Sequence, residues 1–495
     1  MPNPERMTPI DAAWLRMDRP NNPMMIVGVM KLEGKVDPAL VEDLISKRLL
    51  AHSRFRQFID RTPTGWFWTD DPHFDLARHV RHVRLPAPGG KAELESFVAE
   101  LASQPLDPNR PLWQFHLVED YEGGLAVVSR MHHAIADGIA LVRVMMSMTD
   151  EATDARGVEE SLAGGQGGVD ARLGLGGLGG SLSSAIGQSM RMYGSMLRLA
   201  TNPMQIFDYA RTASGFASEF AWLLFMPTDT KTRLKGTPSG NKRVAWGEPI
   251  ALSEVKAVGH ALGCSVNDVV LCAVAGALRG YLASKGDTVE GVDVRALVPV
   301  NLRPADEPPT LGNRFGIVGV LLPVGVAHPL ERLYEVRRRM EELKHSYEPP
   351  ATLMLIASMG LGPKLVQDQL FDLLTSRSTA VMTNVPGPQR PLHIGGYRVR
   401  DIISWVPQSC DLGLGLSILS FDGNVQFAVT TDAALVPDPD EIVKRFQSAF
   451  EAMLYSVLLD TQLHPVPPQL ASDSAARAKS SRSSSSEASQ VLASD

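Results

Sequence analysis

The residues whose types could do chemistry together form one short run, the sequence MHHAIADG at positions 131–138. A valine-rich apolar run at 125–131 precedes it and is typical of a β-strand. Apolar residues recur after it, from 139 to 146, at spacings of three and four, which predicts the start of a helix. Asp137 stands at the junction, where a carboxylate can cap the first helical turn. The sequence therefore places two histidines at the end of a strand, just before a tight turn into a helix.

The two histidines should lie on opposite faces of that strand, because neighbouring strand residues point in opposite directions. At most one imidazole can then face a given cleft. This argues against a metal site built on the pair, since two ligands must converge on one ion. The pattern favours one histidine in chemistry while its neighbour supports the backbone or packs, and spacing alone leaves open whether His132 or His133 is the reactive one. A pair of histidines at a strand end most often has a structural role, and only the full pattern His-His-x-x-x-Asp-Gly favours chemistry here.

The composition is that of a globular protein with a large core. The chain has 495 residues, of which 44% are hydrophobic and 21% charged, and this length favours two domains over one. A net charge of −7 does not support nucleic-acid binding, which requires a basic face. The three cysteines lack any paired spacing, so we expect buried thiols in a reducing compartment rather than disulfides or a zinc site.

Targeting signals are not evident in the sequence. The N-terminus lacks the charged-then-apolar layout of a signal peptide. No run of 18 or more apolar residues occurs, so no membrane-spanning helix is predicted. We therefore expect a cytoplasmic protein, with peripheral contact to the inner membrane face or to lipid inclusions left open.

The chain divides into four parts. Residues 1–160 alternate strands and helices and should form an α/β layered half that carries the histidine run. Residues 161–238 open with nine glycines between positions 164 and 180, which predicts a flexible linker followed by crossover helices. Residues 239–466 alternate strands and helices again and should form a second half. The Ser/Ala-rich tail at 467–495 should be disordered.

The apolar stretch at 184–226 within the linker region admits two interpretations. One is a crossover helix packed on the core, and the other is an amphipathic patch that enters a lipid surface. A patch rich in tryptophan and phenylalanine would suit water-insoluble substrates.

Individual elements follow from periodicity and turn signals. Expected helices span 38–52, 91–103, 252–262, 265–282, 330–345, 352–374 and 439–458. Expected strands span 24–32, 114–118, 125–131, 244–246, 292–300, 315–324, 412–419 and 425–431. Asp422-Gly423, between the last two strands, is a strong hairpin signal.

Seven short motifs, spread in order along the chain, carry a resemblance to a known family. They are Thr8-Pro9-Ile10-Asp11 with Asn22-Pro23-Met24, Pro111-Leu112-Trp113, His132 to Gly138, Ser265-Val266-Asn267-Asp268, Asn301-Leu302-Arg303, Leu311-Gly312-Asn313 and Thr383-Asn384-Val385-Pro386-Gly387-Pro388. Together they resemble the bacterial wax ester synthase/acyl-CoA:diacylglycerol acyltransferase family, within the superfamily of acyltransferases that share His-His-x-x-x-Asp-Gly. The resemblance extends from about residue 7 to residue 458, which is nearly all of the globular part.

The resemblance implies both a fold and an activity. The fold is α/β (α+β layered), with two chloramphenicol-acetyltransferase-like halves, mixed sheets and an active-site channel between the halves. The activity is transfer of a long-chain fatty acyl group from acyl-CoA to a fatty alcohol or to diacylglycerol. Acyl-CoA is then a co-substrate, and no cofactor or metal is expected. The partners are these lipids, with peripheral contact to a membrane or lipid-droplet surface.

By the same resemblance, His133 is the general base. A thioester is already activated, so no covalent acyl-enzyme is needed, but an alcohol must lose its proton as it attacks. An imidazole with an ordinary pKa of about 6.5 suits that task at neutral pH. The imidazolium can then return the proton to the departing CoA sulfur.

The remaining candidates each have a structural alternative. An oxyanion needs a donor, and Asn267 is either that donor or a residue that caps a helix. Asp137 is a catalytic-site candidate that more readily fixes the turn than acts as an acid. Gly138 permits close approach of the acyl chain. Asp268 is a substrate-binding candidate whose structural alternative is a role in a capping box. Trp113 is a second substrate-binding candidate, and its alternative is packing.

Two further functions remain open from the sequence. One is a related acyltransferase that uses a carrier-protein donor or a polar alcohol acceptor. The other is a non-catalytic protein that binds lipid surfaces, although such a role would not require His133 and Asp137. The sequence contains no G-x-S-x-G, no H-E-x-x-H and no Walker loop, so serine hydrolases, zinc peptidases and NTPases are not indicated.

Overall fold

The computed structural model describes residues 4–153, 227–301, 313, 315–344, 356 and 364–459. The glycine-rich run, the apolar stretch at 184–226, the first part of the helix expected at 352–374 and the tail at 467–495 lie outside the described residues.

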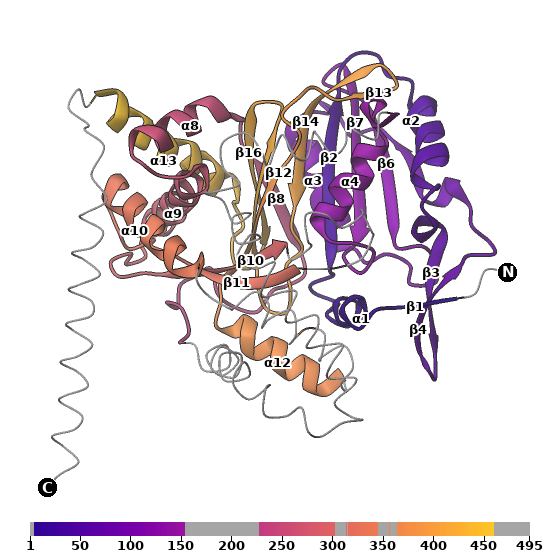
Figure 1. The fold of residues 1–495 in the computed structure, drawn as a ribbon, viewed down its shortest axis with the longest axis horizontal. Helices are drawn as coiled ribbons and strands as arrows, with labels where there is room; N and C mark the ends of the chain where they lie inside the picture. Colours follow the sequence, from indigo (N-terminus) through magenta and orange to yellow (C-terminus); the bar gives the residue numbers. More distant parts are fainter. Residues whose placement is uncertain are drawn as a thin grey trace, which may run out of the picture.

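Two large sheets lie side by side and give the molecule its two halves (Figure 1). The N-terminal sheet has the order β13-β14-β2-β7-β6-β5. Its strands are β2 (Met25–Leu32), β5 (Val80–Val83), β6 (Trp113–Tyr121), β7 (Gly124–His132), β13 (His393–Ile394) and β14 (Tyr397–Trp405). A small third sheet has the order β1-β4-β3, from β1 (Glu5–Arg6), β3 (Gln57–Thr62) and β4 (Gly65–Asp70).

The C-terminal sheet has the order β11-β10-β12-β15-β16-β8, with β9 paired to β16. Its strands are β8 (Lys242–Trp246), β9 (Ile250–Ala251), β10 (Val294–Asn301), β11 (Phe315–Leu322), β12 (Ala380–Pro386), β15 (Leu414–Phe421) and β16 (Asn424–Asp432). Pairing of β12 is parallel to both of its neighbours, whereas the other pairs are antiparallel, so the sheet is mixed as expected. Asp422 and Gly423 both have positive φ, 44° and 74°, in the predicted hairpin.

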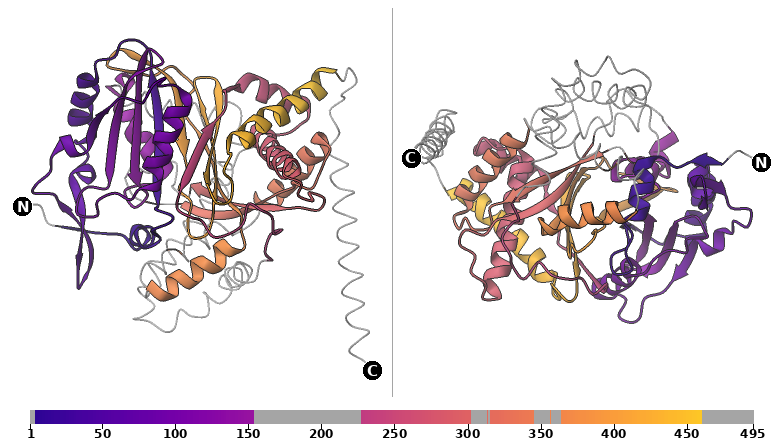
Figure 2. Two further views of the ribbon diagram at one scale, coloured as in Figure 1. Left: turned by 180° about the vertical axis from the view of Figure 1, so that it is seen from behind. Right: turned by 90° about the horizontal axis from the view of Figure 1, so that it is seen from below.

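Helices cover the outer side of the C-terminal sheet (Figure 2). They are α8 (Leu252–Ala261), α9 (Val266–Ser284), α10 (Pro329–Lys344) and α13 (Asp440–Leu459). Within the described part of the chain, α9 is the one helix long and apolar enough to cross a membrane, but 67% of its apolar window is buried in the protein. It is the central helix of the second core, as its continuous run of alanine, valine and leucine suggests.

The N-terminal half contributes four α-helices within the described residues. They are α1 (Pro9–Arg16), α2 (Pro38–Leu44), α3 (Lys91–Ser103) and α4 (Gly138–Ser147). The structure confirms α3 at the predicted residues, and it shows α1, which the sequence analysis did not predict. One further helix, α12 (Lys364–Ser376), lies below the junction (Figure 1).

Strand β14 comes from the second half of the sequence but completes the sheet of the first. It pairs antiparallel with β2, placing Ile403 opposite Val29 and Trp405 opposite Val27. The two sheets therefore do not follow the expected division of the chain at residue 239, and no strand was expected at 397–405. The exchange satisfies the backbone groups of β2, which would otherwise form an exposed sheet edge.

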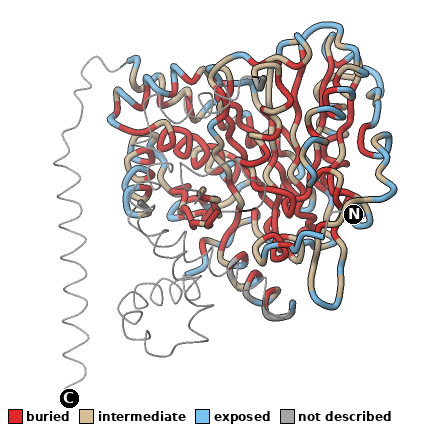
Figure 3. The backbone as a smooth tube through the Cα atoms, turned by 45° about the vertical axis from the view of Figure 1, so that its right-hand side comes forward, coloured by how far each residue is buried: buried red, intermediate tan, exposed pale blue. Residues whose placement is uncertain are grey.

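Burial follows the two sheets, as the red segments of Figure 3 show. Two separate hydrophobic cores occupy the two halves. A third, small cluster joins them, and its members include Trp14 from α1, Met24 before β2, Phe315 from β11 and Phe371 from α12. Part of the contact between the halves is therefore apolar.

We expect the first half not to fold by itself. A fragment of residues 1–153 lacks β14, so β2 would expose its hydrogen-bonding groups and its buried face. The fragment should show no cooperative urea unfolding transition by circular dichroism, whereas the full chain should. A fragment that unfolds as cooperatively as the full chain would contradict the role assigned to β14.

Candidate active site

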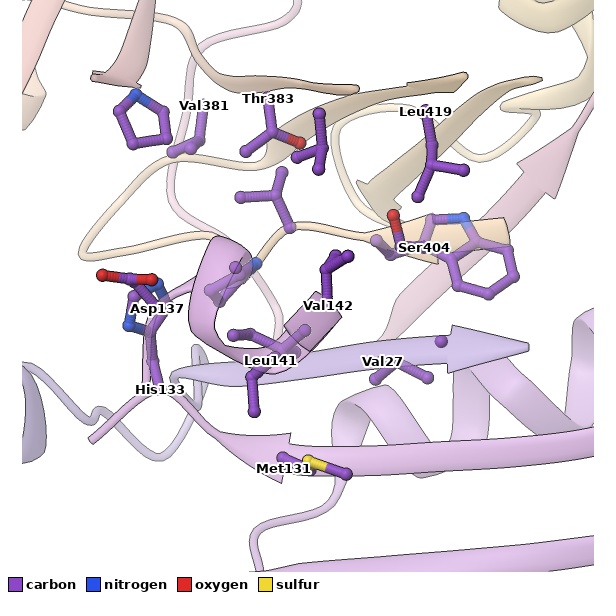
Figure 4. Close-up of a pocket in the computed structure, with 18 of the residues that line it drawn as sticks. Val27, Met131, His133, Asp137, Leu141, Val142, Val381, Thr383, Ser404 and Leu419 are labelled. Atoms are coloured by element: carbon purple, nitrogen blue, oxygen red, sulfur yellow. The ribbon is translucent and has the colours of Figure 1, made fainter. Parts of the chain in front are cut away.

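A cavity of about 280 Å³ lies at the junction of the two halves. One wall comes from β2, β7, β14 and α4, and the other from β10, β11 and β12. Figure 4 shows Leu141 and Val142 of α4 extending into it, with Val381 and Thr383 of β12 opposite. Most lining side chains are aliphatic, so the cavity suits an apolar chain.

His133 lies at one end of this cavity, directly after the last residue of β7 (Figure 4). Its backbone N–H donates to the Met24 carbonyl at 2.9 Å, which extends the pairing with β2 by one residue. Its ring stacks on Trp14 with a centroid separation of 4.8 Å and an angle of 25°. Phe315 contacts the ring from β11, with centroids 5.5 Å apart. Residues from both halves therefore enclose the imidazole.

This enclosure controls the charge of His133. Burial lowers the pKa of the imidazole from 6.5 to about 4, and the nearby Asp137 carboxylate only partly opposes that shift. The ring is consequently neutral near pH 7 and able to accept a proton from a bound substrate. The reason is desolvation of the charged form by the aromatic and aliphatic surroundings.

Asp137 and Gly138 begin α4, as predicted. The Asp137 side chain caps the helix by accepting the Ala140 N–H at 2.9 Å. Both residues line the cavity. A Cβ added at Gly138 would meet nothing within 4 Å, so the absence of a side chain leaves open space beside His133. Figure 4 shows the Asp137 carboxylate next to the imidazole.

His132 lies on the opposite face of β7 and is 2% exposed. Its Nδ1 accepts the Ala134 N–H at 3.0 Å, which assigns the ring proton to Nε2. That Nε2 is 3.1 Å from the Asp18 carboxylate. Asp18 also accepts the Met24 N–H at 2.6 Å. His132 therefore supports the backbone on both sides of its neighbour and does not line the cavity.

Asn267 and Asp268 lie in the first turn of α9. The cap is Ser265, whose hydroxyl accepts the Asp268 N–H at 3.1 Å, while the Asp268 carboxylate accepts the Ser265 N–H at 2.9 Å. The structure thus confirms the capping box and gives the capping role to Ser265 rather than to Asn267. Asn267 accepts a hydrogen bond from Asn384 at 2.9 Å, and Asn384 lines the cavity. Neither Asn267 nor Asp268 is among the described residues that line the cavity.

Trp113 is fully buried at the start of β6. Its indole N–H donates to the Phe55 carbonyl at 2.8 Å, and its ring stacks on His79 at 4.5 Å. It does not belong to the described cavity lining. The geometry places Trp113 in the core of the first half, which matches the packing alternative.

The cysteines are all buried, as expected. Burial raises the pKa of Cys264 to about 12 and those of Cys272 and Cys410 to about 11. A thiol with such a pKa is not a nucleophile near neutral pH.

Sequence reasoning missed the residues that enclose His133. Trp14 lies on α1, whose start was signalled by Thr8-Pro9, a capping residue followed by proline at the first helical position. Phe315 opens a predicted strand, but nothing in its spacing indicates a contact with residue 133. Asn384 was identified only as part of a family motif, and the structure places it within β12 at the cavity wall.

Two family models match the chain. The wax ester synthase/diacylglycerol acyltransferase catalytic domain matches residues 7–270, and the C-terminal domain of the same family matches residues 311–454. The chain belongs to the wax ester synthase/diacylglycerol acyltransferase (WS/DGAT) family. It is an acyltransferase, as the order of its motifs predicted.

The names of similar proteins agree with this family assignment. A probable diacylglycerol O-acyltransferase of Mycobacterium tuberculosis is 28% identical over 457 residues, which cover 90% of this chain and 94% of the relative. The structure of a wax ester synthase/diacylglycerol acyltransferase from Marinobacter aquaeolei VT8 is similar with a TM-score of 0.64 and 22% identity, covering 91% of this chain and 99% of that one.

The fold extends beyond the WS/DGAT family. The first condensation domain of the calcium-dependent antibiotic synthetase is similar with a TM-score of 0.57 and 14% identity, over 92% of this chain and 96% of that chain. The expected two-half fold with mixed sheets is therefore confirmed.

We expect His133 to titrate far below an ordinary histidine. Its ring should have a midpoint near 4 when followed by ¹³Cε1–¹H NMR, with the His133→Ala spectrum providing the assignment. Since the folded pKa lies below the unfolded value of 6.5, the unfolded chain binds this proton first, and His133 should lower the free energy of unfolding as the pH falls from 6.5 toward 4. A midpoint at or above 6.5 would contradict the enclosure described here.

Proposed function

We propose that this WS/DGAT family member transfers a long-chain acyl group from acyl-CoA to the hydroxyl of a fatty alcohol or diacylglycerol, with His133 as general base. The observation that carries the proposal is a buried, neutral imidazole at the wall of an apolar cavity between the two halves. Acyl-CoA serves as co-substrate, and no other cofactor is required because the thioester is already activated.

The proposed reaction is a direct transfer in a ternary complex. The imidazole removes the hydroxyl proton as the alcohol oxygen attacks the thioester carbonyl, forming a C–O bond. The tetrahedral intermediate then collapses, the C–S bond breaks, and the imidazolium returns its proton to the CoA sulfur. Ester and free CoA are the products, so protons and electrons balance.

Two surrounding groups support the charged intermediate state of His133. The Asp137 carboxylate acts on the imidazolium electrostatically and favours its protonated form. The face of Trp14, stacked on the ring, attracts a cation through its quadrupole. The surroundings of His133 therefore have two effects. Burial keeps the ring neutral in the free enzyme, and Asp137 and Trp14 stabilise the cation that forms in the transition state.

The oxyanion also requires a donor. Asn267 was the candidate from the sequence, and its amide oxygen holds the Asn384 side chain at the cavity wall. We propose that Asn384, which lines the cavity, donates a hydrogen bond to the oxyanion, and that Asn267 orients its amide group. This assignment keeps Asn267 in the mechanism but places it behind the cavity wall.

The lipid substrates are water-insoluble, which supports peripheral contact with a membrane or lipid inclusion on its cytoplasmic side. Tyr455, Leu458 and Leu459 at the end of α13 are exposed and apolar, and they would suit such a surface. Flotation of the protein with vesicles that contain diacylglycerol tests this contact. A protein that stays at the bottom of the gradient with and without diacylglycerol would contradict it.

The His133→Ala substitution should abolish transfer without unfolding the protein. CoA release from palmitoyl-CoA would be measured with hexadecanol, with dipalmitoylglycerol and without an acceptor. Loss of the base should reduce acceptor-dependent release by about 10²- to 10⁴-fold. Turnover close to that of the wild type would exclude His133 as the base.

The same assay separates the alternatives. Release with either acceptor identifies the acceptor class by the ratio of rates. A folded wild-type protein that releases no CoA with either acceptor would favour a carrier-protein donor, a polar acceptor or a non-catalytic role in lipid binding.

The Gly138→Val substitution should narrow the cavity next to His133. A Cβ at this position meets open space, so the added side chain should occupy volume that an acyl chain needs rather than disturb the protein. We expect kcat/KM for palmitoyl-CoA to fall on the order of 10- to 100-fold while the melting temperature changes little. Equal losses for palmitoyl-CoA and acetyl-CoA would show that chain accommodation is not the cause.

A further inference from the structure

Asn313 connects the two halves at the backbone of His133. Its Nδ2 donates to the His133 carbonyl at 2.9 Å and to Asp11 Oδ1 at 2.8 Å. Its backbone N–H donates to the same Asp11 oxygen at 3.1 Å. All three residues are less than 10% exposed, so these bonds do not compete with bulk water.

Asp11 is itself held in place. It lies in the first turn of α1, where the Thr8 hydroxyl donates to Asp11 Oδ2 at 2.7 Å and the Asp11 N–H donates back to the Thr8 oxygen at 3.1 Å. Burial raises the pKa of Asp11, whereas the bonds from Asn313 and Thr8 act to lower it. One turn further along α1, Trp14 stacks on the imidazole. The short helix α1 thus controls both the backbone and the ring of His133.

Two buried polar atoms at this place have no hydrogen-bond partner among the residues that the structure describes. One is Oδ1 of Asn313 and the other is Nδ1 of His133. The amide orientation is not arbitrary, because the two oxygens of Asp11 and His133 both require the Nδ2 donor. The Asn313 amide oxygen is therefore the atom without a hydrogen-bond partner. It belongs to the residue that binds the backbone of His133, whose Nδ1 also has no partner among the described residues. Buried polar groups of this kind call for a functional explanation.

We propose that Asn313, held by Asp11, is the positioning residue of His133: its amide nitrogen fixes the histidine backbone, and its amide oxygen receives the Nδ1 hydrogen so that Nε2 accepts the substrate proton. This inference rests on the proposed function of His133 as general base. As the ring becomes an imidazolium, its Nδ1–H becomes a stronger donor, which favours a hydrogen bond to the unsatisfied amide oxygen of Asn313.

The electrostatics of the site agree with this arrangement. Burial has the largest effect on the pKa of His133 and lowers it, whereas the Asn313 side chain raises it, as a group that accepts a hydrogen bond from the ring N–H does. The charged or titratable groups around the ring are Asp137 from α4, His132 from β7, and Asp11 from α1 through Asn313. The other close neighbours, Trp14 and Phe315, are uncharged.

The test is an Asn313→Leu substitution, which keeps the approximate volume and removes the donor and the acceptor. We expect kcat for acyl transfer to fall on the order of 10²-fold with KM nearly unchanged. In protein labelled with ¹⁵N-histidine, the side-chain shifts of His133 should move from the Nδ1–H tautomer toward a mixture. The NMR readout requires no turnover, so it decides this inference even if the proposed reaction is not observed.

Gln367→Leu is the matched control. Gln367 is a buried amide on α12 that donates to the Ala13 carbonyl of α1 at 2.9 Å but does not bond to His133. It should leave the His133 tautomer unchanged. An equal tautomer change in both variants, or none in Asn313→Leu, would overturn the proposal, as would a loss confined to KM.

A second pair of variants keeps the test valid if Asn313→Leu does not fold. Asn at position 11 can retain the Oδ1 acceptor for Asn313 and donate to Thr8, whereas Ala retains neither bond. Asp11→Asn should therefore preserve kcat and the tautomer, and Asp11→Ala should reproduce the changes expected for Asn313→Leu. Identical behaviour of the two variants would contradict the proposed role of Asp11.

Discussion

The site depends on the desolvation of one imidazole at the junction between two sheets. His133 belongs to the end of β7, but its surroundings come from α1, α4 and β11. Their aromatic faces remove water from the ring and hold its pKa well below that of a free histidine. The general-base role proposed for His133 requires a ring that is neutral before the reaction and stabilised as a cation during it, and burial with nearby acceptors suits that requirement.

That junction exists because the two halves exchange structure. Strand β14 supplies the N-terminal sheet with a neighbour for β2, and its side chains Ile403 and Ser404 line the cavity that β12 closes from the other side. Met24 lies directly before β2, and its carbonyl accepts the backbone N–H of His133. The cavity therefore requires both halves to be folded and packed together.

A division of labour between the two histidines follows from strand geometry. His132 holds the turn through Nδ1, which accepts the Ala134 N–H, and its Nε2 lies 3.1 Å from Asp18, whereas His133 faces the cavity. The sequence limited the cleft to one imidazole, and the family resemblance named His133. Alternation along a strand is a local property, so the first inference needed no tertiary information. In the same way, spacing predicted α3, the Asp422-Gly423 hairpin and the Ser265 capping box, because each depends on residues close in the chain.

The tertiary structure alone decided which residues surround His133. Asn313 lies 302 positions from Asp11 and 180 positions from His133 in the chain, yet the three residues share one hydrogen-bond network. The motifs identified Asp11, Asn313 and His133 as candidates but could not predict that they contact one another. Such contacts depend on how the two sheets pack and on β14, which comes from the second half of the sequence and joins the first sheet. Asn267 illustrates the limit: its place at a helix start was predictable, and its position behind Asn384 was not. The sequence by itself determined the local elements, the candidate base and the family, whereas long-range packing determined the enclosure that sets the charge of that base.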